Sequence, residues 1–182
     1  MILMKIDKVD GDCMIPGFSK HFTCSSASFS ITRELADSAK AGTADITFGV
    51  GQLEDLSIGK TMDRGSPDLA KFAMRGATLG TVEIKFVETT TEDVDPVNLV
   101  FLWIKLDKAF IKTWSMNGSE DGRPEEELTL WYNKIAFKWF FTDDGKTPKG
   151  SAEFLWDHVK NREWPSGDAA LPAPTAALVK DK

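Results

Sequence analysis

The sequence contains few of the residues that most often build catalytic and metal sites. It has only two cysteines, Cys13 and Cys24, and two histidines, His21 and His158. Two cysteines are too few for a disulfide-based fold, and a chain of 182 residues buries a core without such cross-links. We therefore expect one domain that folds in a reducing cytoplasm.

Basic charge and long apolar runs are also scarce. The chain has 22 Lys and Arg against 28 Asp and Glu, and its net charge of -6 opposes binding to a phosphate backbone. The apolar start Met1-Ile2-Leu3-Met4 is too short for the core of a signal peptide, and no later segment is long enough to span a membrane. We expect no nucleic-acid partner, no membrane insertion, and an export route without a cleavable signal.

The patterns that are present are those of β-strands. Val, Ile, Thr, Phe and Trp recur in alternating runs between Gly, Asp and Asn clusters, whereas helical periodicity is rare. The sequence predicts a mainly β fold, a β-barrel of two packed antiparallel sheets with one short α-helix on the outside. The predicted strands are Ile2–Ile6, Phe22–Arg33, Leu53–Met62, Leu79–Thr89, Leu99–Trp114, Glu127–Phe141 and Ala152–Trp156.

One segment, Ser66–Gly76, has the signals of a helix. Ser66 is placed to cap the free N–H groups, Pro67 suits the first helical position, and Gly76 suits a left-handed stop. Leu69, Phe72 and Ala73 form its predicted buried stripe.

Several segments are predicted to be irregular. Residues 34–51 lack periodicity and predict a long, mobile surface loop. Asn117–Pro124 contains two turn dipeptides and predicts a protruding hairpin connection. The apolar parity changes near Asn133-Lys134, which predicts a β-bulge. Residues 1–164 form the predicted barrel domain, and the Ala- and Pro-rich residues 165–182 predict a disordered tail.

The strand Leu99–Leu106 is apolar on both faces, and one short helix is too small to cover the outer one. Trp131 and Phe140 also lie opposite the main apolar series of their strand. Exposed aromatic surface usually marks an interface, so self-association is predicted. The alternative is that the long loop and the tail cover these residues within one chain. The predicted subunit-interface residues are Phe101, Trp103, Trp131 and Phe140 on the strands and Asn117 and Gly118 in the hairpin connection.

No motif predicts catalysis, a cofactor or a metal. Gly59-Lys60-Thr61 resembles the end of a P-loop, but a Glu54 stands where the first glycine is required. Cys13, His21 and Cys24 lack a fourth ligand and the spacing of a zinc site. His158 follows Asp157 but has no nucleophile motif. We expect a protein that is not an enzyme.

Five blocks of sequence, in order, resemble the haemolysin-coregulated protein (Hcp) family, the tube subunit of bacterial type VI secretion systems. The resemblance runs from Leu3 to about Asn161, and its most specific blocks are the third and the fourth. The blocks are Leu3–Asp7 with Val9-Asp10-Gly11, Ser28-Phe29-Ser30, Lys60–Leu69, Glu127–Ile135, and Trp156-Asp157 with Lys160-Asn161. The chain departs from the family pattern in residues 35–51, in Glu125-Glu126-Glu127 and after Trp164.

The resemblance implies a β-barrel flanked by one helix, with six copies closing into a ring and rings stacking into a secreted tube. It also implies partners: other copies of the chain, the sheath and spike proteins of the apparatus, and effectors carried in the ring. Two alternatives stay open, a tail-tube protein of another contractile particle and a monomeric barrel that binds a small apolar ligand.

Overall fold

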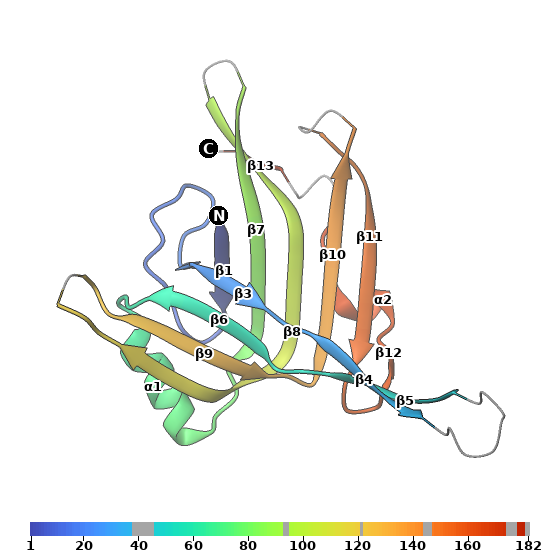
Figure 1. Cartoon of the computed structure of the whole chain (residues 1–182). Coiled ribbons are helices and arrows are strands. Elements are labelled where there is room, and N and C mark those ends of the chain that lie inside the picture. Colours follow the sequence, from blue (N-terminus) through green and yellow to red (C-terminus); the bar gives the residue numbers. More distant parts are fainter. Residues whose placement is uncertain (38–45, 93–94, 121, 144–146, 174–177, 181–182) are drawn as a thin grey trace.

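The computed structural model describes residues 1–37, 46–92, 95–120, 122–143, 147–173 and 178–180 (Figure 1). Its elements in chain order are β1 (Ile2–Ile6), β2 (Phe22–Cys24), β3 (Ser26–Ser28), β4 (Ile31–Asp37), β5 (Ile46–Leu53), β6 (Leu56–Thr61), α1 (Ser66–Arg75), β7 (Gly80–Glu92), β8 (Asp95–Asn117), β9 (Glu125–Trp131), β10 (Lys134–Thr142), β11 (Pro148–Asp157), β12 (Arg162–Glu163), α2 (Ser166–Ala169) and β13 (Leu178–Lys180).

The 23-residue strand β8 organises the molecule because it belongs to both halves of one 11-stranded sheet. In one half the order is β12-β11-β10-β8-β7-β1-β2, and in the other β3, β6 and β9 lead to the distal part of β8. All of these pairs are antiparallel. The two halves cross one another in Figure 1 and enclose the main core, which includes Ile84, Ile104 and Leu128.

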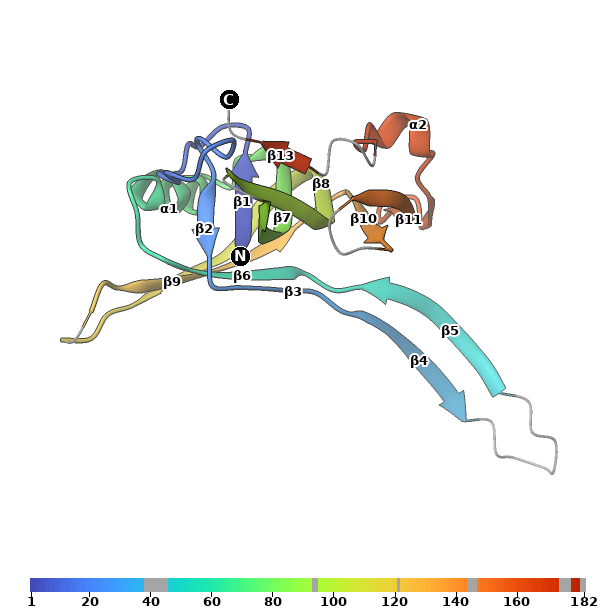
Figure 2. The ribbon, with the colours of Figure 1, turned by 90° about the horizontal axis from the view of Figure 1, so that it is seen from above.

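The mainly β prediction is confirmed, but the sheets do not close into a barrel. Strands β4 and β5 form a separate two-stranded sheet that extends away from the body (Figure 2). The prediction of a loop over residues 34–51 is therefore wrong for 34–37 and 46–51, which belong to this hairpin; residues 38–45 lie outside the described part. We call the hairpin β4–β5 the arm.

The second apolar face of β8 is covered within the chain. One cluster packs Leu3, Phe18, Val100 and Phe140 under the segment that joins β1 to β2. Another packs Ala136 against Trp164 and against Ala169 of the tail. Intramolecular cover, the alternative left open by the sequence, thus accounts for much of this face, although the covering segment precedes β2.

The tail is ordered where the structure describes it. Residues 166–169 form α2, and β13 pairs with Val97–Leu99 of β8. The expected disorder of 165–182 is therefore not found in these two segments, because both have apolar side chains that pack on the sheet. Composition alone did not reveal these contacts.

The predicted helix is α1, with one change at its start. Gly65 is the N-cap and no side chain caps the helix, so the capping role predicted for Ser66 is wrong. Gly76 adopts the predicted left-handed conformation, with φ of 61°. Leu69 is buried, while Phe72 and Ala73 are partly buried against the core.

The predicted bulge near Asn133-Lys134 is an interruption instead. β9 ends at Trp131 and β10 begins at Lys134, and both continue along the same edge of β8. The predicted shift in alternation is confirmed. Tyr132 and Ile135 are three residues apart, yet both are buried in the main core.

Candidate assembly surface

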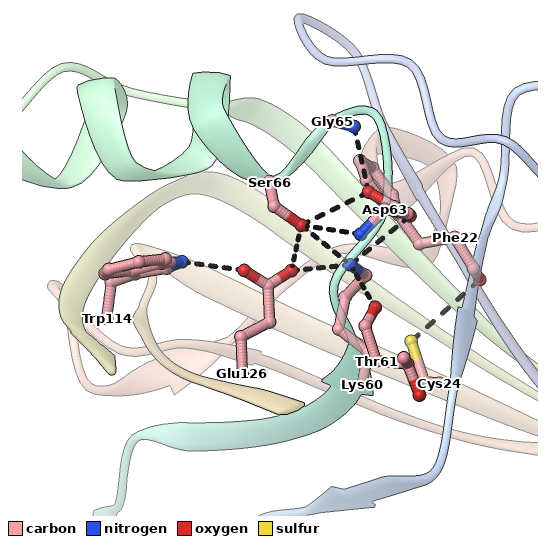
Figure 3. A network of polar contacts seen from close by, with 9 residues as sticks. All are labelled: Phe22, Cys24, Lys60, Thr61, Asp63, Gly65, Ser66, Trp114 and Glu126. Atoms are coloured by element: carbon pink, nitrogen blue, oxygen red, sulfur yellow. Dashed lines mark hydrogen bonds and ion pairs between the residues drawn. The ribbon is translucent and has the colours of Figure 1, made fainter. Parts of the chain in front are cut away.

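A buried ion pair fixes the helix start to the sheet (Figure 3). Lys60 of β6 and Glu126 of β9 are directly opposite in the register, and Lys60 Nζ lies 2.5 Å from Glu126 Oε1. Both side chains are fully buried, so each charge depends on the other for compensation. The pair lies near the turn of the hairpin β8–β9, where Glu126 pairs with Met116.

Further groups complete this network. Ser66 Oγ donates to Glu126 Oε1 at 2.8 Å, and Trp114 Nε1 donates to Glu126 Oε2 at 2.8 Å. Asp63 forms a second ion pair with Lys60 at 3.2 Å. Figure 3 shows these side chains converging from β6, α1, β8 and β9. The network joins four elements without presenting a reactive group to solvent.

Sequence reasoning missed this network, although a signal existed. Lys60 continues the buried series of Leu56 and Ile58, and Glu126 begins that of Leu128 and Leu130. Two opposite charges on the buried faces of two strands indicate a cross-strand ion pair. Lys60, Asp63 and Ser66 all lie in the third block of the resemblance.

Aromatic side chains on one face of the sheet are incompletely covered. The rings of Phe86 and Phe101 lie 6.1 Å apart, and those of Phe101 and Trp139 lie 5.6 Å apart. Trp139 is 48% exposed and Phe141 is 46% exposed. We call Phe86, Phe101, Trp139 and Phe141 the aromatic patch.

Phe101 reaches this face because the pairing of β7 with β8 is irregular there. Phe86 pairs with Leu102 and Val87 pairs with Val100, which leaves Phe101 as the extra residue of a bulge. Trp139 also pairs with Leu102, so the three rings meet on one side. Strict alternation would have placed Phe101 on the opposite face from Trp139.

The other predicted interface residues lie elsewhere. Phe140 is only 2% exposed and packs in the second cluster, so in this conformation it offers no surface to a neighbour. Trp103 is partly buried beneath Lys85, whose Nζ lies 4.3 Å from the ring centroid. Trp131 contacts Phe110 and His158, and is also partly buried. Asn117 and Gly118 are exposed at the hairpin tip.

The arm and the body together line an apolar groove. Its walls include Ile31, Val50 and Leu53 of the arm, and Phe154 and Trp156 of β11. Ile31 is 53% exposed and Val50 is 64% exposed. The rings of Phe154 and Trp156 are stacked, and their centroids lie 6.3 Å apart. The groove is concave, open and mostly apolar, and Arg33 and Asn161 are its polar lining residues.

Cys13, His21 and Cys24, which the sequence analysis compared with a zinc site, are all buried. Cys13 and Cys24 are buried free thiols, and burial raises the pKa of Cys24 to about 12. His21 Nδ1 bonds to the carbonyl of Ser19, and its Nε2 lies 3.2 Å from Lys85 Nζ. Across the part of the chain that the structure describes, no group of three or more His, Cys, Asp or Glu could hold a metal ion.

A family model matches residues 3–139, and its description is "Type VI secretion system effector, Hcp". The chain belongs to this family. The matched range covers more than half of the chain and includes the Lys60–Leu69 block, Glu126 and most of the aromatic patch. No curated protein matches the chain.

Solved structures have the same fold. A type six secretion system protein superposes with a TM-score of 0.77 at 19% identity, covering 90% of this chain and 98% of that one. Hcp1 from Salmonella typhimurium gives 0.69 at 19% identity, covering 90% and 97%. The secreted protein Hcp3 from Pseudomonas aeruginosa gives 0.53 at 14% identity, covering 91% and 100%. In the described residues, no helix is long and apolar enough to cross a membrane.

Proposed function

We propose that the chain is a non-enzymatic tube subunit of a type VI secretion system. Copies close into six-membered rings, the rings stack into a tube, and the tube leaves the cell through the secretion apparatus without a cleavable signal. Effectors bind in the ring and are carried with it. Sheath and spike proteins are the further partners.

The observation that carries this proposal is the arm. It stands away from the body in Figure 2, and Ile31 and Val50 are largely exposed on it. Apolar side chains on an extended hairpin contribute no hydrophobic stabilisation while they face water. An unpaired hairpin edge also favours pairing with another chain. A neighbouring copy that fills the groove beside the arm buries both residues.

The aromatic patch supports the same conclusion. Trp139 and Phe141 are each about half exposed, and aromatic side chains are enriched at subunit interfaces. A closed ring repeats one heterologous contact, so each copy contributes two different surfaces to it. The groove and the patch are two such surfaces.

The alternatives fit less well. A monomeric ligand-binding barrel needs an enclosed cavity, whereas these sheets stay open and the space between them is filled by the core. A tail-tube subunit of another contractile particle has the same assembly physics, and type VI sheath and baseplate genes beside this one would exclude it.

The test compares two single variants with the wild type by light scattering on a size-exclusion column. Val50→Glu places a charge in the groove and should reduce the assembled fraction at least tenfold, with unchanged circular dichroism. Met74→Glu, at a residue 89% exposed on α1, is the control and should assemble as the wild type does. Equal assembly of both variants would contradict the role assigned to the arm.

A further inference from the structure

A slot as wide as one strand lies beside β8, beyond the point where β10 stops pairing with β8. The register of β10 with β8 ends at Trp139 opposite Leu102. Beyond that point, in the described residues, Phe140 and Phe141 pair only with β11. Residues Val97–Leu99 of β8 pair with β7 on one side, and on the other side they would present an unpaired edge. Such edges are templates for strand addition.

The C-terminal strand β13 fills this slot. Leu178 pairs with Leu99, Val179 with Asn98, and Lys180 with Val97, all antiparallel. β13 enters between the upper part of β8 and the β10–β11 hairpin in Figure 1. The slot is therefore closed by a segment far from it in sequence.

The slot also has space for one side chain, that of Val179, over Gly17, and we call this space the seat. Val179 is partly buried against the cluster that contains Leu99, Val100 and Phe140. Gly17 adopts φ of 78°, and a Cβ at this position would overlap a methyl group of Val179. Glycine thus supplies both the left-handed backbone and the space. Asn98 is buried, and its Oδ1 accepts a hydrogen bond from Thr89 Oγ1 at 2.9 Å.

The slot and its occupant belong to different parts of the chain. Gly17 and Val97–Leu99 lie within the family match of residues 3–139, whereas β13 lies beyond it. A ladder of three residues with one seated side chain is a small contact, and short strand pairs are marginal in water. The occupant is therefore exchangeable.

We propose that this slot is a docking site for an extended apolar peptide, bound by strand addition to β8 with a β-branched side chain seated over Gly17. The chain's own β13 is its intramolecular occupant and competes with a peptide from outside. Backbone hydrogen bonds supply the affinity and the Gly17 seat supplies the selectivity. The site does not depend on ring assembly.

The test uses the full-length chain and its Val179→Asp variant. Aspartate is too polar for the seat, so β13 should leave, and those amides of Val97–Leu99 that point toward β13 rather than β7 should exchange hydrogen at least tenfold faster. A synthetic peptide carrying the Leu178-Val179-Lys180 sequence should then shift the amide resonances of Val97–Leu99 in the variant. The wild type should bind this peptide at least tenfold more weakly, because its own strand occupies the slot.

Two controls make the result specific. Val159→Asp changes a valine that is 63% exposed and should leave both exchange and peptide binding as in the wild type. The same peptide with Asp in place of Val179 should not bind either chain. Unchanged exchange in the Val179→Asp variant would overturn the seating of β13. Faster exchange without peptide binding would overturn the docking site, and neither result bears on ring assembly.

Discussion

At the scale of single residues, the pair Lys60–Glu126 is an ion pair in which both side chains are fully buried. Its partners Asp63, Ser66 and Trp114 leave neither charge uncompensated. Removing one member leaves the charge of the other uncompensated in the core. This lowers the free energy of unfolding far more than the loss of a surface ion pair does.

Lys60→Met should lower the free energy of unfolding by about 3–5 kcal/mol, measured by urea denaturation. Lys71→Met is the matched control, because Lys71 pairs with Asp68 on the surface of α1 with both side chains more than half exposed. That variant should lose less than about 1 kcal/mol. Equal losses in the two variants would show that the network does not stabilise the fold.

His21 should make the fold sensitive to acid. Burial, the largest cause, and then the charges of Lys85 and Lys5 lower the pKa of His21 below 6.5. The bond to the Ser19 carbonyl opposes this shift, and Glu83 pairs with Lys85 at 3.3 Å nearby. The unfolded chain therefore binds the proton more readily than the folded chain.

Because the folded pKa is the lower one, the stabilisation is complete above the unfolded value near 6.5 and is lost as the pH falls through the folded pKa. Urea midpoints measured from pH 7.5 to pH 5 should fall, and in the His21→Gln variant they should fall less. An identical pH dependence in both chains would exclude His21 as the titrating group.

At the scale of elements, local signals predicted local structure well. The alternation in Ile2–Ile6 and Leu79–Thr89 indicated β1 and β7, and Gly76 indicated where α1 ends. Elements fixed by distant partners were missed. Residues 34–37 and 46–51 of the arm lack an alternating pattern, β13 is three residues long, and the bulge at Phe101 arises from the pairing of β8 with β7.

A substitution at Gly76 tests the glycine signal that ends α1, separately from long-range packing. It has φ of 61° and open space where a Cβ would lie, so Gly76→Ala adds only backbone strain. The expected loss is about 1–2 kcal/mol in the free energy of unfolding by thermal or urea denaturation. Gly122→Ala, also in open space but without a positive φ, should change it by less than about 0.5 kcal/mol. A neutral Gly76→Ala would contradict the strain argument.

At the scale of the whole molecule, the sequence indicated the family through the order of short blocks, and the family model confirms it. The second apolar face predicted for β8 is only partly exposed, because the segment before β2 and the tail cover much of it. Phe101 lies in the exposed aromatic patch, whereas Phe140 is buried. Burial of this kind depends on long-range packing, which alternation along one strand does not encode.

The central claim is that copies of this chain assemble into rings. Native mass spectrometry of the wild type over a range of concentrations, with negative-stain imaging of the same sample, tests it most directly. Ring assembly should give a species of about six times the 20.1 kDa chain mass and ring-shaped particles. A single 20.1 kDa species at every concentration would contradict it and would leave the family fold without the assembly proposed here.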